Sequence, residues 1–228
     1  MRFLTVGGGV FDKIRSDFSG KRERCLAVKL SGNDAKDADA WNELMDRLKD
    51  GMLAAFQSYI VQTDHDARRL EGQRAMPGWN FCQYFLQRES VIYALELLGM
   101  HDDVFEEYEQ LEQAFFQSME QQGAPWFSKF GGSAPGDEAG DILDVRRKPY
   151  RQAILNNTVT IFDFRIYLFV RQIAALLETG KLARVCEHSL QYMALWGKTL
   201  REYQTSLMPG FAEIWTWTVC HAVIQRCD

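Results

Sequence analysis

The sequence has little proline: five residues in 228, against about 5% in an average protein. Because proline removes a backbone donor and breaks helices, this scarcity favours long uninterrupted helices. All five prolines fall between the helices that the apolar pattern predicts, at Pro77, Pro125, Pro135, Pro149 and Pro209. With 46% apolar and 25% charged residues, the composition excludes disordered, collagen-like and disulfide-scaffold chains.

Cysteine pairs, long apolar runs and a basic excess are also missing. The five cysteines show no C-x-x-C spacing, which argues against a disulfide framework or a zinc ribbon and favours a reducing compartment. No run approaches the roughly 18 apolar residues that span a bilayer, and the N-terminal residues lack the pattern of a signal peptide. The net charge of −5 argues against a nucleic-acid partner. We therefore expect a cytoplasmic protein that is peripheral to membranes at most.

Residues 1–36 are the least helical part of the sequence. Short apolar runs predict strands at residues 3–6 and 25–30, and residues 10–18 have the spacing of an amphipathic helix. Two isolated strands are marginal in water, so this segment is interpreted as the remnant of a larger α/β region or as a flap on the helices. A domain boundary is therefore predicted at residues 36 and 37.

From residue 37 onward the apolar residues follow a helical period. Residues three, four and seven apart between Trp41 and Thr63 predict one helix that reaches Glu71 or Gly72, with Asp39 as its N-cap. The last turns of this helix are polar on nearly all sides. That end is expected to face solvent or a partner.

Further helices follow, separated by glycine or proline. They are predicted at residues 81–98, at 102–122 with Asp102 as the cap, at 158–178, at 181–207 and at 211–226. The glycine-rich segment at residues 123–148 is predicted to be a flexible loop. The fold class predicted for residues 37–228 is mainly α, an irregular tetratricopeptide-like α-solenoid of antiparallel helical hairpins, with a closed helical bundle as the alternative.

One of these helices carries charge of a single sign. Between Gly99 and Gln122 there is no lysine or arginine, and there are seven acidic residues: Asp102, Asp103, Glu106, Glu107, Glu109, Glu112 and Glu120. Such a face is either solvated or a landing surface for a basic partner, and the solvated face is the favoured interpretation.

The residue types that carry catalysis or bind metal do not stand at suitable spacings. The four histidines lie in different predicted elements, and none is part of H-E-x-x-H. Cys220 and His221 are neighbours, but adjacent helical positions point about 100° apart and do not face each other. The triple glycine at residues 7–9 lacks the other positions of a phosphate-binding loop. We therefore predict no catalytic residue, no cofactor and no metal site, and a protein that is not an enzyme.

Aromatic residues give a stronger indication of binding. Trp126, Phe127 and Phe130 fall in the predicted loop, where they either cover the helical core, as is favoured, or stand exposed as anchors. Four nearby cations are Arg146, Arg147, Lys148 and Arg151. Together with the aromatics they suggest an alternative function, a helical adaptor that binds an anionic membrane surface or another protein. A small hydrolase hidden in the aromatic core is the weakest hypothesis.

Several longer strings occur in an order that matches a known family. They are DKIRSDF at residues 12–18, WN at 41–42, PGWNFCQYFL at 77–86, YEQLEQAF at 108–115, RKP at 147–149 and DFRIYLFVRQ at 163–172. In this order they resemble the TRAPP II-specific large subunit, that is, the TRAPP subunit 10 family of the transport protein particle. The resemblance runs from about residue 10 to the last residue, and it gives no counterpart for residues 131–140.

The resemblance implies a fragment, because the chains of this family are several times longer. The fragment would span the end of the N-terminal region and part of the helical solenoid. The resemblance further implies a non-catalytic scaffold in a tethering and Rab guanine-nucleotide-exchange complex at the Golgi. Other TRAPP subunits and, through the assembled complex, a Rab/Ypt GTPase are the implied partners. Exchange chemistry in such complexes belongs to the small core subunits, so no catalytic residue is carried over to this chain.

Overall fold

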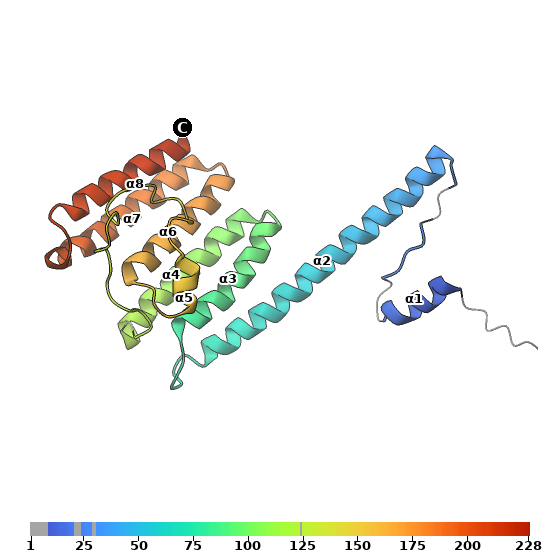
Figure 1. Cartoon of the computed structure of the whole chain (residues 1–228), viewed down its shortest axis with the longest axis horizontal. Helices are drawn as coiled ribbons and strands as arrows, with labels where there is room; N and C mark the ends of the chain where they lie inside the picture. Colours follow the sequence, from blue (N-terminus) through green and yellow to red (C-terminus); the bar gives the residue numbers. More distant parts are fainter. Residues whose placement is uncertain (1–8, 21–23, 29–30, 124) are drawn as a thin grey trace, which may run out of the picture. The chain divides into compact units, whose positions relative to one another are not determined.

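The computed structural model describes residues 9–20, 24–28, 31–123 and 125–228, and all regular structure in these residues is helical (Figure 1). The chain divides into two compact units, of which one ends at Val61 and the other spans Gln62–Asp228. The first helices are α1 (Val10–Phe18) and α2 (Asp34–Gly72), and α2 runs from the first unit into the second. The predicted mainly helical class is confirmed.

The first unit contains the predicted short helix, but its described residues contain no strand. α1 begins and ends at the predicted residues, Val10 and Phe18. Residues 25–28 are irregular, so the predicted strand is wrong over these four positions, which have no neighbouring strand to pair with in the described chain. The other predicted strand, at residues 3–6, lies outside the described residues, as do positions 7, 8, 29 and 30.

α2 begins earlier than the sequence predicts. Its first residue is Asp34, so Asp39 lies inside the helix and its prediction as the N-cap is wrong. Instead, the Asp37 carboxylate accepts hydrogen bonds from the backbone N–H groups of Ser31 (2.6 Å) and Gly32 (3.0 Å). The bond from Ser31 is the largest of the effects that lower the pKa of Asp37. A first-turn carboxylate that reaches back to preceding donors stabilises the start of a helix in the manner of a capping box.

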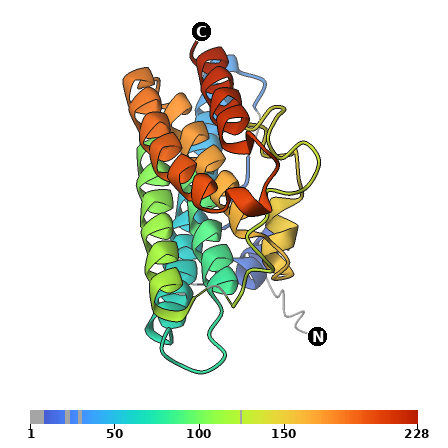
Figure 2. The same cartoon turned by 90° about the vertical axis from the view of Figure 1, so that its left-hand side faces the viewer.

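The second unit is a stack of helices whose direction alternates (Figure 2). Its helices are α3 (Phe81–Leu97), α4 (His101–Gln122), α5 (Tyr150–Leu155), α6 (Ile161–Glu178), α7 (Leu182–Glu202) and α8 (Phe211–Cys227), with a 3-10 turn, η1, at Gln204–Ser206. α3 packs on α4, α4 on α6, α6 on α7 and α7 on α8, and the short α5 lies against α3 and α6. The sequence pattern predicts each of these helices except α5, which is too short to show a period.

Turns at glycine separate the helices of this unit. Gly99 (φ 72°) and Gly180 (φ 68°) follow α3 and α6 in the left-handed conformation, which glycine adopts without a Cβ clash. The N-cap of α4 is Met100, so the prediction of Asp102 as the cap is wrong. The Asp102 carboxylate accepts a hydrogen bond from Lys181 Nζ at 2.6 Å instead of capping its own helix.

Phenylalanine rings fill the core between α3, α4 and α6. Phe85, Phe115 and Phe164 are fully buried, and the Phe164 ring centroid lies 5.0 Å from the centroids of both Phe85 and Phe115. The Phe85–Phe164 pair is edge-to-face, the arrangement that the ring quadrupoles favour. These contacts fix the three helices relative to one another.

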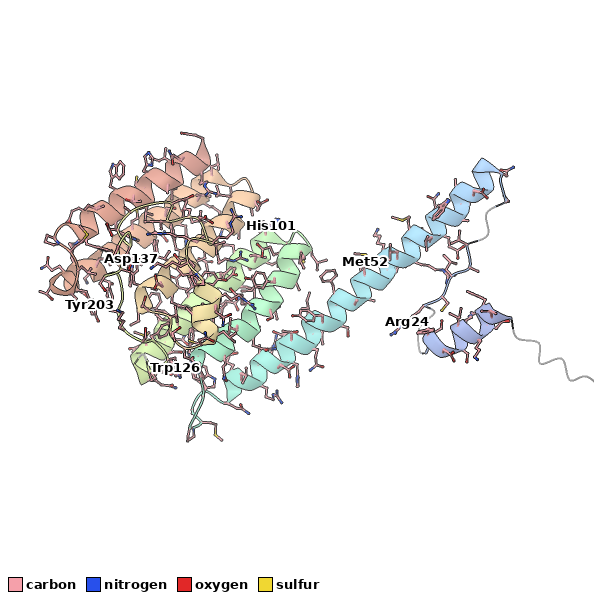
Figure 3. All side chains as sticks on the ribbon, in the orientation of Figure 1. Arg24, Met52, His101, Trp126, Asp137 and Tyr203 are labelled. Carbon is pink, nitrogen blue, oxygen red and sulfur yellow. The ribbon has the colours of Figure 1, made fainter. Side chains whose placement is uncertain are left out.

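The segment between α4 and α5 is irregular, yet it packs onto the helices. Trp126 and Phe127 are buried. The indole N–H of Trp126, which Figure 3 labels, donates to the Trp79 carbonyl at 3.0 Å. The interpretation of these two aromatics as core residues is confirmed, and the alternative of exposed anchors is wrong for them. Phe130 is partly buried and packs on the same core. The flexibility of residues 123–148 stays a prediction.

An ion triad ties this segment to α6. Lys148 Nζ lies 2.5 Å from Asp137 Oδ1 and 2.6 Å from Asp163 Oδ1. Asp137 is buried, and its other oxygen accepts a hydrogen bond from the Ala134 N–H at 3.1 Å. Because a buried carboxylate is costly without partners, these contacts stabilise the packing of the segment on α6.

Two buried tryptophans, Trp126 and Trp215, differ in the hydrogen bonding of their indole N–H groups. The Trp215 indole N–H has no hydrogen-bond acceptor, whereas the Trp126 N–H is bonded to Trp79. Substitution by phenylalanine removes similar atoms from both sites, but in Trp126→Phe it also leaves a carbonyl unpaired. We expect both substitutions to lower the free energy of unfolding. The loss for Trp126→Phe is expected to exceed that for Trp215→Phe by about 1–2 kcal/mol. Urea unfolding of both variants measures the difference, and equal losses would contradict the prediction.

Candidate interaction surfaces

A buried carboxylate lies where α3, α4, α5 and α6 meet. Glu89 is fully buried, its Oε1 accepts a hydrogen bond from the Tyr167 hydroxyl at 2.5 Å, and its Oε2 accepts one from Arg151 Nε at 2.9 Å. The Tyr108 hydroxyl lies 3.4 Å from Oε1 and accepts a hydrogen bond from Arg171 Nε at 2.8 Å. Burial raises the pKa of Glu89 and that of Tyr167. Both Glu89 oxygens are therefore occupied by partners from the protein itself.

A buried guanidinium forms a second polar centre, between α4, α6 and α7. Arg165 is 2% exposed and pairs with Glu112, whose other oxygen accepts a hydrogen bond from Gln172 Nε2 at 2.9 Å. Aromatic rings surround the guanidinium, and its Cζ lies 4.6 Å from the ring centroid of Phe116 and 5.4 Å from that of Tyr192. Cation–π contacts and the ion pair thus stabilise this buried charge.

The acidic face of α4 is partly paired with cations of the same unit. The pairs are Glu107 with Arg88, Glu112 with Arg165, and Asp102 with Lys181. The hydrogen bond from Lys181 is the largest of the effects that lower the pKa of Asp102. Helices distant in sequence supply these cations, and the side chains of Lys181 and Asp102 remain 46% and 53% exposed. The solvated face stays the favoured interpretation. Asp103, Glu106 and Glu120 are exposed.

The basic cluster predicted to contact lipid is also paired for the most part. Arg147 donates to the Gly136 carbonyl, Lys148 pairs with Asp137 and Asp163, and Arg151 pairs with Glu89. Of the four cations, Arg146 has an 89% exposed side chain, 3.4 Å from Asp144. Since Trp126 and Phe127 are buried, the geometry gives no support to the membrane-binding alternative.

The histidines lie in separate places. His188 Nε2 lies 3.0 Å from Gln172 Oε1, and burial lowers the pKa of this imidazole. His221 stacks on Trp217, with 5.1 Å between the ring centroids, and Cys220 beside it is exposed. Throughout the part of the chain that the structure describes, no group of three or more histidine, cysteine, aspartate or glutamate side chains could hold a metal ion.

A cavity of about 370 Å³ lies between α3 and α5. Its lining consists of Gln83, Leu86, Gln87, Ser90, Arg151, Gln152 and Leu155. The Ser90 hydroxyl donates to the Leu86 carbonyl of its own helix at 2.9 Å, and the lining supplies no carboxylate or imidazole to activate it. This cavity gives no support to the hydrolase hypothesis.

An apolar stripe lies on the outward side of α8. Ile214, Trp217, His221 and Ile224 follow one another at three- and four-residue spacing, and Trp217 is 66% exposed. The other side of α8 contains buried Trp215 and packs on α7. An exposed tryptophan within an apolar stripe is typical of a protein–protein interface.

A longer stripe lies on α2, in the first unit. Its members recur at alternating spacings of four and three and are Trp41, Met45, Leu48, Met52, Ala55 and Tyr59. All six are exposed, and Figure 3 shows Met52 on this helix. A helix in water normally buries such a stripe against another element. Sequence periodicity identifies the stripe, but only the structure shows that its side chains are exposed among the described residues.

These observations describe a helical chain whose buried charges are paired internally and whose apolar stripes are exposed. Large exposed apolar faces are rare on monomers and mark interaction sites. The chain therefore has the features of a part of a larger protein assembly.

Comparison with known proteins shows which family this chain resembles. Residues 2–74 match the family model described as trafficking protein particle complex subunit 10-like, N-terminal. The trafficking protein particle complex II-specific subunit 130 homolog of Oryza sativa subsp. japonica is 29% identical over 217 residues, which cover 95% of this chain. Trafficking protein particle complex subunit 10 of Mus musculus is 29% identical over 229 residues, which cover 96%. The resemblance to the TRAPP subunit 10 family is confirmed.

The two relatives match nearly all of this chain, but the chain covers only a small share of each relative. The chain spans 17% of the length of the Oryza sativa protein and 18% of that of the Mus musculus protein. No solved structure matches the chain. Among the described residues, no helix has both the length and the hydropathy needed to span a membrane.

Proposed function

We propose that this chain acts as a non-catalytic scaffold segment of a TRAPP II-specific large subunit, in a complex that tethers vesicles and exchanges Rab nucleotide. The observation that carries the proposal is its similarity, over nearly its whole length, to proteins named as TRAPP subunits in a plant, an amoeba and a mammal. The exposed stripes on α2 and α8 support it, because a scaffold needs surfaces that its neighbours cover.

The packing order of the second unit supports an α-solenoid within this scaffold. The main contacts run from α3 through α4, α6 and α7 to α8, each helix packing on the next. A closed bundle would also pack its last helix firmly on its first. In a solenoid each helical hairpin contacts only its neighbours, which leaves long faces for partners. Residues 1–36 are proposed to be the end of an α/β region that precedes this solenoid.

The proposed partners are other TRAPP subunits and, through the assembled complex, a Rab/Ypt GTPase. The proposed location is the cytoplasmic side of Golgi membranes, where the complex associates peripherally. Internal pairing of the basic cluster supports attachment through other subunits, because these cations are already bound to carboxylates and carbonyls.

Affinity capture with the other recombinant TRAPP subunits tests this function. The tagged chain is expected to retain at least one of them at micromolar concentration. Trp217→Ala is expected to weaken retention about tenfold if the α8 stripe is in contact, since exposed tryptophans are frequent hot spots. Gln225→Ala is the matched control, an exposed polar residue on the same helix. A folded chain that retains none of the subunits would overturn the proposal.

A further inference from the structure

The stripe on α2 has the spacing of a coiled-coil seam. Met45, Leu48, Met52 and Ala55 alternate at three and four residues, with Trp41 and Tyr59 one step beyond at either end. On a helix of 3.6 residues per turn, all six side chains project within roughly 40° of one direction. The exposed fractions of the five large members lie between 49% and 59%. The helix thus presents one narrow, continuous apolar face.

Nothing in the described part of the first unit covers this face. Among residues 9–61, as far as they are described, no residue is buried. α1 is also an amphipathic helix. Its apolar residues are exposed as well, namely Val10, Phe11, Ile14 and Phe18. In contrast, the second unit buries a large aromatic core. The free energy of burying the α2 stripe is therefore available to a partner.

The area of the stripe is sufficient for a partner of equal size. From Trp41 to Tyr59 it extends about 27 Å along the helix, and its half-exposed side chains offer about 100 Å² each. Two such stripes would bury on the order of 1,200 Å² in total, the lower end of specific interfaces. The four residues of the α8 stripe offer less than this, so α2 is the stronger candidate for self-association.

The stripe is complementary to itself when two copies run antiparallel. A two-fold axis near residue 50 places Leu48 opposite Met52 of the second copy and Met45 opposite Ala55 of the second copy. Trp41 then lies opposite Tyr59 of the second copy, an aromatic pair at each end. At the inner positions Leu48 thus faces the similarly sized Met52, and Met45 faces the small Ala55, so apolar side chains meet along the whole seam.

The distribution of charge along α2 also favours the antiparallel arrangement of two copies. The described residues 37–50 of α2 contain Asp37, Asp39, Glu43, Asp46 and Asp50 against Arg47 and Lys49, whereas residues 51–61 contain no charge. A parallel pair would place two acidic halves side by side. An antiparallel pair places each acidic half beside an uncharged half and so avoids that repulsion.

We propose that two copies of this chain associate through α2, as an antiparallel helix pair centred on residue 50. Lys49 flanks the seam close to the two-fold axis, where it meets Lys49 of the second copy. This repulsion limits the affinity, so Lys49→Ala is expected to lower the dimer dissociation constant about twofold. In a parallel pair Lys49 would lie beside Leu44 of the second copy, and the same substitution would not tighten the dimer.

Sedimentation equilibrium of the whole 228-residue chain tests the proposal. The chain has a mass of 26.3 kDa, and at tens of micromolar its apparent mass is expected to approach twice that value. Leu48→Glu combined with Met52→Glu places charge in the seam and is expected to give the mass of a single chain. Leu53→Glu is the matched control, because Leu53 is 49% exposed on the same helix but points away from the stripe.

Disulfide mapping tests the direction. A mixture of Leu48→Cys and Met52→Cys chains is expected to form a cross-link between positions 48 and 52, identified by peptide mass spectrometry. Preferential 48–48 and 52–52 links would overturn the antiparallel arrangement. A single-chain mass at several hundred micromolar, or a dimer unaffected by the double substitution, would overturn the proposal as a whole. If that monomer still binds TRAPP subunits and the double substitution abolishes the binding, the proposed function stands and the stripe contacts a subunit instead.

Discussion

Gly131→Ala is expected to lower the free energy of unfolding of the second unit by about 3–5 kcal/mol. Gly131 has φ 94°, a conformation that costs an alanine about 1–3 kcal/mol. A Cβ at this position would also lie 2.5 Å from Thr160 Cβ, closer still to Thr160 Oγ1, and 3.1 Å from Phe162 Cβ. Overpacking of this kind costs about 1–3 kcal/mol more.

The neighbours of Gly131 cannot move away at low cost. Thr160 is the N-cap of α6, and its Oγ1 accepts a hydrogen bond from the Asp163 N–H at 3.0 Å. Next to the contact, the Phe162 N–H donates to the Phe130 carbonyl at 2.7 Å and the Ile161 N–H donates to the Lys129 carbonyl at 3.0 Å. A shift that relieves the clash would therefore break the cap or the pairing of the loop with the start of α6.

Gly99→Ala is the control for backbone strain alone. Gly99 also has a positive φ, 72°, but no atom lies within 4 Å of a Cβ built there. It is expected to cost about 1 kcal/mol. Urea unfolding followed by tryptophan fluorescence measures both variants, and equal losses for Gly131→Ala and Gly99→Ala would show that the contact with Thr160 does not matter.

Glu89→Leu is expected to cost about 3–5 kcal/mol. The substitution leaves the Tyr167 hydroxyl without its 2.5 Å acceptor in a buried site, and it leaves Arg151 without its partner. Removing one member of a buried polar cluster is costly because the remaining groups keep their desolvation penalty. Arg146→Leu removes an exposed cation that is paired only at the surface, and it should change stability by less than about 1 kcal/mol. A similar small loss for Glu89→Leu would contradict the role assigned to the cluster.

The same carboxylate gives the stability a pH dependence of known sign. Burial raises the pKa of Glu89 above its ordinary value of 4.5. Between pH 4.5 and the raised value, the folded chain binds this proton and the unfolded chain does not. The stabilising contribution of this proton to the free energy of unfolding is therefore fully present below pH 4.5. It is lost as pH rises through the pKa of Glu89 in the folded chain, by at most about 1.4 kcal/mol per pH unit.

Glu89→Gln isolates this contribution because glutamine does not titrate. The stability of the variant relative to the unsubstituted chain should increase as pH rises from 4.5 toward 7. Urea unfolding of both chains at intervals across that range measures the difference, so effects common to both cancel. A difference that stays constant with pH would show that the pKa of Glu89 is not raised.

Helix positions were largely predictable from the sequence. α1, α3 and α8 end within a residue or so of the predicted limits, because apolar period and flanking glycine act locally. The caps were less predictable. Asp39 and Asp102 are good capping residues by type, yet their helices begin earlier, at Asp34 and His101. The Asp102 carboxylate binds Lys181 instead.

Surface chemistry was the least predictable from sequence. The acidic face of α4 and the basic cluster after the loop both look solvated when each segment is considered alone. In the fold their partners come from other helices, as in the pairs of Glu112 with Arg165 and of Arg151 with Glu89. Such pairs join residues more than fifty positions apart, and no local pattern encodes them.

The sequence by itself determined the helical class, the position of most helices and the family that the chain resembles, because periodicity and matching strings are properties of the chain alone. The tertiary structure decided which apolar stripes are covered. Trp126 and Phe127 enter the core, whereas the stripe from Trp41 to Tyr59 stays exposed. The physical reason is that burial depends on which surfaces meet in space, and an apolar stripe has the same sequence whether its partner is the chain's own core or another molecule.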